Sequence, residues 1–284
     1  MRRVRVLRVA LLTLLLGFPS AARPFDRPED HAIASLTITI LYDNNPFAVG
    51  LTAEWGFSAL VETEGRVILF DTGGNGKTVL SHMEQLGKNP GAITVVVISH
   101  GHGDHTGGLG EILEANSRLK VFIPQSFSEN FSEAIRSHGA EVIRVGEPIN
   151  ILPGIYSTGE MGETIPEQAL ILSTIQGLVV MTGCAHPGIV NMVARAKALL
   201  EREVYLVLGG FHLMSKSHRD IESIIEAFQR MGVQRVAPCH CTGDRARSLF
   251  EKSYRDGFIR AGVGRVIRIR EKESQGRPLL SGGG

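Results

Sequence analysis

Cysteine is scarce in this chain of 284 residues, which contains only Cys184, Cys239 and Cys241. With so few cysteines the fold does not depend on a disulfide framework and must rest on a hydrophobic core. A bond between Cys239 and Cys241, two residues apart, would be strained. Because three is an odd number, at least one thiol stays free or binds a metal ion.

The chain also lacks an excess of charge of either sign, because 30 basic residues nearly balance 29 acidic ones and leave a net charge of +1. The chain therefore has no basic field of the kind that marks nucleic-acid-binding proteins. The basic residues within 265–272 alternate with Val266, Ile267 and Ile269, which predicts an edge strand with a charged outer face. We expect a small-molecule substrate and no nucleic-acid partner, and the sequence does not indicate an oligomeric state.

Long hydrophobic runs are missing except near the N terminus, where residues 9–18 are apolar apart from Thr13 and Gly17. Four arginines precede this run, and Pro-Ser-Ala-Ala follows it at residues 19–22. This layout predicts a secretory signal peptide over residues 1–22, cleaved near Ala22, and therefore a periplasmic or secreted protein. The run is short for a membrane span, so we expect no stable span after cleavage, with an uncleaved N-terminal anchor as the alternative.

The rest of the chain has the composition of one folded unit, since 43% hydrophobic residues are ample for a large core. Residues 23–35 form a polar lead-in. Strand-like and helix-like patterns fill residues 36–272 without an internal repeat, which predicts a single α/β domain (α+β by some schemes). Residues 273–284 are expected to form a flexible tail.

One loop concentrates the candidate chemistry. Residues 94–98 are apolar and mostly β-branched, which predicts a buried strand, and residues 99–109 then read Ser-His-Gly-His-Gly-Asp-His-Thr-Gly-Gly-Leu. Four potential ligands lie in this loop: His100, His102, Asp104 and His105. Imidazole and carboxylate together suit zinc, iron or manganese. The first two histidines project to one side and can chelate one ion, while the last two residues turn toward a second.

Three later loops repeat this layout, in which an apolar strand ends at glycine and a histidine. They lie at residues 182–189, 209–213 and 238–243 and carry His186, His212 and His240. Such strand ends can converge on one edge of a sheet. We therefore predict His186 as the third protein ligand of the first metal ion and His240 as the last ligand of the second.

The loop at residues 99–109 resembles the signature of the metallo-β-lactamase superfamily. The resemblance implies a four-layer αββα sandwich with a metal site at one edge, between two sheets. It also implies that Asp71, at the end of another strand, orders the metal loop without being a ligand. Residues 54–58, 182–191, 209–213 and 238–243 narrow the resemblance to the branch typified by the archaeal dihydropterin-ribofuranosylaminobenzene phosphate synthase, over residues 36–269.

The sequence departs from the superfamily pattern in one respect. Many members have an aspartate that bridges two metal ions, and this chain has no aspartate at the expected places. By strand order Cys184 could take that position, and by spacing His212 could. Three arrangements stay open: Cys184 is a ligand, two ions bind without the bridge, or one ion binds and His212 is free. We interpret His212 as a substrate-facing or acid–base residue.

The leading hypothesis is a metalloenzyme in which metal-bound hydroxide attacks an ester, a phosphoester or a related small substrate. We expect one or two divalent ions, zinc first, with iron or manganese as alternatives. Asp104 would be both ligand and proton acceptor, His212 or Glu160 would steady the substrate or leaving group, and Lys77 could contact a phosphate. A transferase or synthase of the branch type is one alternative, and a non-catalytic metal or ligand sensor on the same fold is another.

Overall fold

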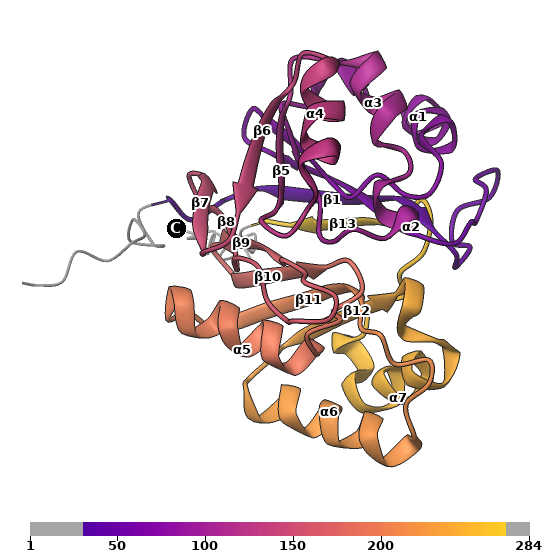
Figure 1. Ribbon diagram of the computed structural model, residues 1–284. Helices are drawn as coiled ribbons and strands as arrows, with labels where there is room; N and C mark the ends of the chain where they lie inside the picture. The colour runs from indigo at the N-terminus through magenta and orange to yellow at the C-terminus, as the bar shows by residue number, and fades with distance from the viewer. Residues whose placement is uncertain (1–30, 271–284) are drawn as a thin grey trace, which may run out of the picture.

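A computed structural model describes residues 31–270, so the predicted signal peptide and the whole of the expected tail lie outside the described residues. Two sheets pack face to face, and helices cover the outer side of each (Figure 1). The strand orders are β13-β1-β2-β3-β4-β5-β6 in the larger sheet and β12-β11-β10-β9-β8-β7 in the smaller.

The larger sheet begins with an antiparallel meander and continues in parallel. β1, β2 and β3 are joined in antiparallel register, and the hairpin between β2 and β3 turns at Gly65, whose φ of 77° suits glycine. β3 to β6 then run parallel. β13 pairs with β1 at the edge, as the alternating basic pattern predicts. The strands span Leu36–Asp43 (β1), Phe57–Thr63 (β2), Arg66–Phe70 (β3), Val95–Val97 (β4), Lys120–Pro124 (β5), Glu141–Val145 (β6) and Val266–Ile269 (β13).

The smaller sheet has the same two-part construction. β7 to β10 pair antiparallel, whereas β10, β11 and β12 run parallel because helices connect them. These strands span Ile149–Leu152 (β7), Ile155–Ser157 (β8), Leu170–Thr174 (β9), Gly177–Thr182 (β10), Val204–Gly210 (β11) and Arg235–Cys239 (β12).

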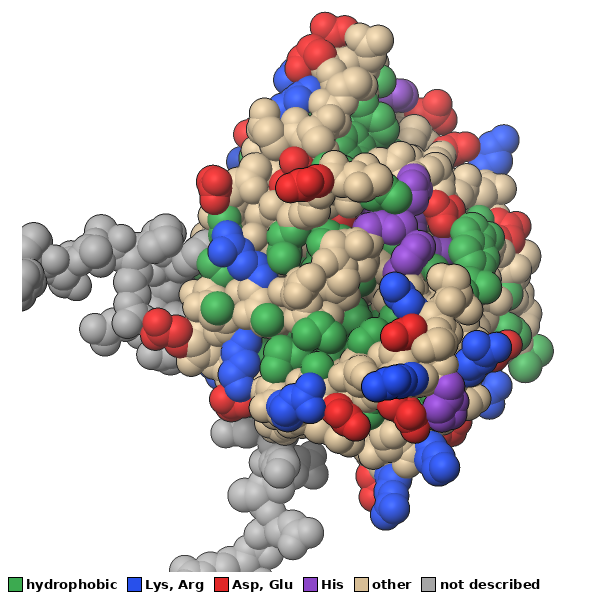
Figure 2. Space-filling view, turned by 60° about the horizontal axis from the view of Figure 1, so that its bottom comes forward, with side chains coloured by type: hydrophobic (Ala, Val, Ile, Leu, Met, Phe, Trp, Pro, Cys, Tyr) green, Lys and Arg blue, Asp and Glu red, His purple; other side chains and the backbone are tan. Residues whose placement is uncertain are grey.

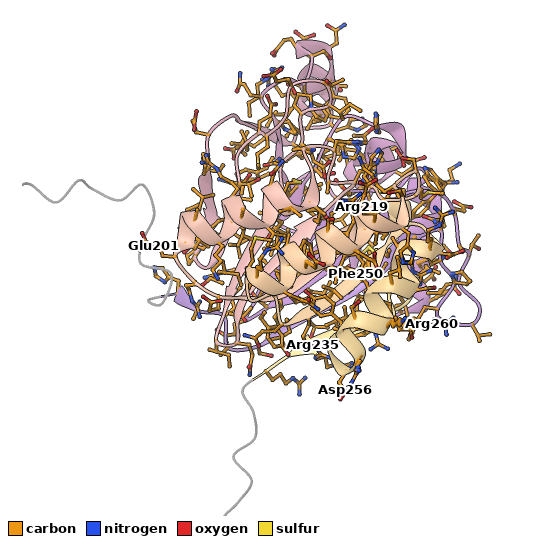
Figure 3. The ribbon with its side chains drawn as sticks, turned by 90° about the horizontal axis from the view of Figure 1, so that it is seen from below. Glu201, Arg219, Arg235, Phe250, Asp256 and Arg260 are labelled. Carbon is orange, nitrogen blue, oxygen red and sulfur yellow. The ribbon has the colours of Figure 1, made fainter. Side chains whose placement is uncertain are left out.

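The helices form the two outer layers. Those next to the larger sheet are Gly76–Gln85 (α1), Gly103–Thr106 (α2), Leu109–Ala115 (α3) and Glu129–Ser137 (α4). Those on the smaller sheet are Ile189–Leu200 (α5), His218–Arg230 (α6) and Asp244–Tyr254 (α7), which lie over it in Figure 3. Phe250 of α7 packs its ring 5.7 Å from Phe228 of α6 and 5.5 Å from Phe211, so the apolar faces of these helices belong to the core. Short 3₁₀ turns occupy Pro90–Ala92, His240–Thr242 and Arg255–Gly257.

Three hydrophobic clusters separate the four layers. The central one lies between the sheets and joins residues such as Ile38 and Phe70 to Val179 and Leu208. The other two lie between each sheet and its helices. The expected four-layer αββα sandwich is therefore confirmed. Within residues 31–270 no helix is both long enough and apolar enough to cross a bilayer.

Candidate metal centre

Candidate ligands from separate loops meet at one edge of the sandwich. His100 and His102 follow β4, and His186 follows β10. His100 Nε2 lies 3.1 Å from His102 Nδ1, which lies 3.3 Å from His186 Nε2. We call these three residues the first set. Figure 2 shows histidine side chains gathered at the surface, with hydrophobic side chains nearby.

A second set lies beside the first and consists of Asp104, His105 and His240. His105 Nε2 lies 3.3 Å from His240 Nε2, although these residues are far apart in sequence. Asp104 Oδ2 lies 3.6 Å from His105 Nε2 and 3.4 Å from His240 Nε2. Both histidines are buried, and the Asp104 side chain is 20% exposed.

These distances fit ligands that share an ion. Zinc–nitrogen bonds of about 2.0–2.1 Å at the tetrahedral angle place two ligand nitrogens about 3.4 Å apart. The nitrogen–nitrogen distances within the first set are 3.1 and 3.3 Å, and that in the second set is 3.3 Å. The residues present therefore fit one divalent ion at each set.

Asp71 orders the loop after β4 through three hydrogen bonds. Its carboxylate accepts from the Ser99 amide at 2.6 Å and the Ser99 hydroxyl at 2.7 Å, and it lies 2.7 Å from His105 Nδ1. Nδ1 of His105 therefore faces the Asp71 carboxylate, and Nε2 faces Asp104 and His240. Such contacts fix the ring orientation of metal-binding histidines. This is the supporting position that the resemblance implies for Asp71.

Asp43, at the end of β1, supports His240 in a similar way. Its Oδ2 accepts the His240 amide at 3.0 Å, and His240 Nδ1 lies 3.0 Å from Asn44 Oδ1. No local sequence pattern identifies Asp43 or Asn44 as part of the site. Asp43, Asn44, Asn45 and Pro46 form a sequence typical of a turn, and only the tertiary structure brings them to the end of β12.

Glu167 is a second support that sequence reasoning misses. Its buried carboxylate accepts four successive amides of the loop after β10, at 2.9–3.1 Å: those of Gly183, Cys184, Ala185 and His186. Burial raises the pKa of Glu167 to about 7, against the lowering effect of the amides. The one available signal is a charged residue just before the apolar run of β9.

The backbone is strained at several of these strand ends. Asp71, Ala185, His212 and His240 have φ values of 54°, 64°, 54° and 45°. A non-glycine residue in this left-handed region costs on the order of 1–3 kcal/mol, and such residues persist where the surroundings enforce them. The hydrogen bonds of Asp71, Glu167 and Asp43 supply that enforcement for three of the loops.

The electrostatics keep several candidate ligands in their metal-binding forms. Burial, together with the neighbouring imidazoles, lowers the pKa of His100 well below its ordinary range. Burial and the nearby His212 lower the pKa of His186 to about 4. Burial opposes ionisation of Asp104, but the hydrogen bond to His240 and the charge of His105 lower its pKa to about 2. His100 and His186 are therefore neutral and Asp104 is ionised at neutral pH.

Cys184 and His212 lie at different depths. Cys184 is buried, and its sulfur lies 3.4 Å from His105 Nε2. His212 is exposed, and its ring centroid lies 4.4 Å from that of His186. A hydrogen bond with Cys241 raises the pKa of His212 against the effect of its partial burial. Cys184 thus lies inside the site and His212 at its rim.

Glu160 and Lys77 do not join the two sets. Glu160 Oε2 accepts the Ser126 amide at 2.7 Å and so anchors a neighbouring loop. Lys77 is exposed in the first turn of α1, where its amide donates to the capping side chain of Asn75. The sequence pattern places both residues near glycine-bearing loops but does not determine their distance from the histidines.

Two pockets and one aromatic side chain border the site. A pocket of about 370 Å³ begins at His102 and includes Phe127 and Phe131. A second pocket, of about 240 Å³, includes the imidazoles of His186 and His212 and the side chain of Lys216. Trp55 is half exposed, and its ring centroid lies 4.8 Å from that of His240.

Comparison with known proteins agrees with this architecture. The model of the metallo-beta-lactamase superfamily matches residues 54–191. A curated relative from Methanocaldococcus jannaschii, 7,8-dihydropterin-6-methyl-4-(beta-D-ribofuranosyl)-aminobenzene-5'-phosphate synthase, is 31% identical over 275 residues, covering 80% of this chain and 92% of the relative. An uncharacterized protein of the same organism is 29% identical over 262 residues, covering 82% of this chain and all of that protein.

Solved structures show the same relationship. A metal-dependent hydrolase of the beta-lactamase superfamily superposes with a TM-score of 0.70 at 29% identity, over 83% of this chain and 100% of the other. A diphosphatase from the PhnP family shares the fold, with a TM-score of 0.56 at 16% identity over 84% and 98% of the two chains. This fold implies divalent metal binding, and its members are mostly enzymes. The chain therefore belongs to the metallo-β-lactamase superfamily and resembles the branch that contains the archaeal synthase.

Proposed function

We propose that the protein is a metal-dependent hydrolase that acts on an ester, a phosphoester or a related bond in a small molecule. The observation that carries this proposal is the convergence of the first and second sets at distances that fit shared ions. Divalent ions, with zinc as the first choice and iron or manganese as alternatives, would supply the Lewis acidity that activates water and polarises the bond.

The chain's own residues would divide the remaining work. Asp104 is ionised and lies between His105 and His240, so it can hold an ion and accept a proton. His212 lies at the rim with a raised pKa, which favours its protonated form and suits a donor to the leaving group. Glu160 supports a pocket wall through the Ser126 amide, which gives it a positioning role.

The two pockets favour a substrate with unlike ends. The pocket at His102 is lined by no lysine, arginine, aspartate or glutamate and presents two phenyl rings, so it suits an apolar or aromatic group. The pocket at His212 contains Lys216, which can attract an anionic group. Lys216 therefore takes the substrate-contact role that the sequence pattern gives to Lys77.

A synthase or transferase is the second candidate. The observation that favours it is the 31% identity to the archaeal synthase over 92% of that protein. The same ligand sets and pockets could hold two reactants while a bond forms between them. The similarity to the synthase supports bond formation, and membership of the superfamily supports hydrolysis to the same degree.

The test combines metal analysis with product analysis on the full-length chain. We expect purified protein to bind one or two zinc ions and to convert members of an ester and phosphodiester panel into products that have gained water. His102→Ala should abolish turnover, whereas His218→Ala, an exposed control on α6, should leave it unchanged. Joined products from mixed small-molecule pools would favour the synthase. Metal binding without turnover would favour a sensor, and absence of stoichiometric metal would refute the proposal.

A further inference from the structure

The Cys184 sulfur lies where the two sets meet. It falls within 4.8 Å of ligand nitrogens of His100 and His186 in one group, and of His105 and His240 in another. Its distance from His105 Nε2 is 3.4 Å. With a zinc–sulfur bond of about 2.3 Å, a tetrahedral ion separates its sulfur and nitrogen ligands by about 3.6 Å. The thiol therefore lies at ligand distance from the second set and next to the first.

The neighbouring buried carboxylates are committed elsewhere. Asp71 accepts from Ser99 and faces the outer nitrogen of His105. Glu167 accepts the four amides of the loop after β10, and its Oε2 lies 3.9 Å from His100 Nδ1. Among the described residues, the three clusters of histidine and cysteine whose ligand atoms all lie within 4.8 Å of one another each include Cys184; the third joins it to His212 and Cys241. A thiol therefore stands where a bridging aspartate is expected.

Local contacts fix this sulfur in place. The Cys184 amide donates to Glu167 at 3.0 Å, and the Cys184 carbonyl accepts from the Cys241 thiol at 3.6 Å. Gly210 of β11 passes so close that a Cβ there would lie 2.7 Å from Cys241 Sγ and 3.2 Å from Cys184 Cα. The loop is held from three sides, so its sulfur is directed toward the sets by the fold.

We propose that Cys184 is a thiolate ligand shared by the two metal positions, an inference that rests on the proposed metalloenzyme function. When an ion binds, the thiol releases its proton to solvent and the sulfur donates an electron pair, so nothing is oxidised or reduced. Thiolate is a soft ligand that favours zinc over manganese and magnesium. The centre should therefore select zinc more strongly than an all-oxygen and nitrogen centre does.

Binding of Co²⁺ in place of zinc detects coordination by the sulfur directly, without any substrate. Metal-free full-length protein titrated with Co²⁺ should develop a sulfur-to-cobalt charge-transfer absorption. Cys184→Ser should lose this absorption and bind zinc at least tenfold more weakly, as loss of a ligand requires. Cys241→Ser and Cys239→Ser, two other buried thiols, should keep it. Cys184→Asp should restore the number of bound ions without the absorption, with circular dichroism confirming that each variant is folded.

Each contrary outcome has a distinct meaning. If the wild type binds cobalt without this absorption, the thiolate inference is wrong while the proposed metalloenzyme stands. If the absorption persists in Cys184→Ser, or disappears only in Cys241→Ser, another thiol is the ligand and the inference is overturned. If the wild type binds no metal, the proposed function fails as well.

Discussion

Replacement of Glu167 by glutamine tests how far the site depends on its buried support. The carboxylate accepts three amides at Oε1 and the His186 amide at Oε2. Glutamine can keep its oxygen toward the group of three, but its amide nitrogen then faces the His186 N–H, and two donors oppose each other. The variant loses one charge-assisted hydrogen bond and leaves a buried donor without an acceptor, which together cost about 2–4 kcal/mol.

The assay should be run at pH 8, above the pKa of about 7, so that the wild-type carboxylate is ionised. We expect Glu167→Gln to lower the free energy of unfolding of the metal-free protein by that amount. It should also weaken zinc binding about 10- to 100-fold, because the loop carries His186 and supports of ligands act at this scale. Glu163→Gln, an exposed change on the same segment, is the matched control.

This role of Glu167 is contradicted if the unfolding free energy of the variant stays within about 0.5 kcal/mol of wild type, the range of ordinary surface substitutions, and its zinc affinity is unchanged. In that case the four amides would be satisfied by other partners, and the strained φ of Ala185 would not depend on Glu167.

Three further predictions use other features. The pKa of His186 is about 4 in the folded protein and 6.5 in the unfolded chain, so the unfolded chain binds more protons between these pH values. The metal-free protein should therefore lose stability as the pH drops from 6.5 toward 4. Urea unfolding curves at pH 7 and pH 5 that coincide would contradict this. Gly183→Ala places a Cβ 2.1 Å from Ser99 Oγ and should cost about 1–3 kcal/mol in denaturant unfolding, whereas Gly110→Ala, with open space, should cost nothing. We propose that residues 1–22 are a signal peptide removed on export, so protein recovered from outside the cytoplasm should lack them by intact-mass measurement; a mass that includes them would indicate an uncleaved anchor.

The sequence predicts the fold and the first loop of the site well because both depend on local patterns. The apolar run at residues 94–98 predicts a strand, and β4 forms over its central three residues, Val95–Val97. The histidine spacing after it places His100 and His102 in one set. The repeated strand-to-glycine pattern likewise leads to His186 and His240. These features need only short-range periodicity and the convergence of parallel strand ends.

Two supports of the site, Glu167 and Asp43, could not be predicted because they act across the chain. Glu167 accepts amides 16 to 19 residues away, and Asp43 accepts the amide of His240, 197 residues away. Nothing local distinguishes Asp43 from a turn aspartate. Glu160 makes a contact of the same kind, because its carboxylate accepts the Ser126 amide 34 residues away.

Trp55 is the only tryptophan of the chain, and its ring packs against that of His240. All indole fluorescence therefore originates beside the second set. An ion that binds His240, or a substrate that covers the half-exposed indole, should change the emission intensity or wavelength. The protein thus carries an intrinsic optical reporter of one metal position, which can be read in the same titration as the cobalt–sulfur absorption and would show in which order the two positions fill.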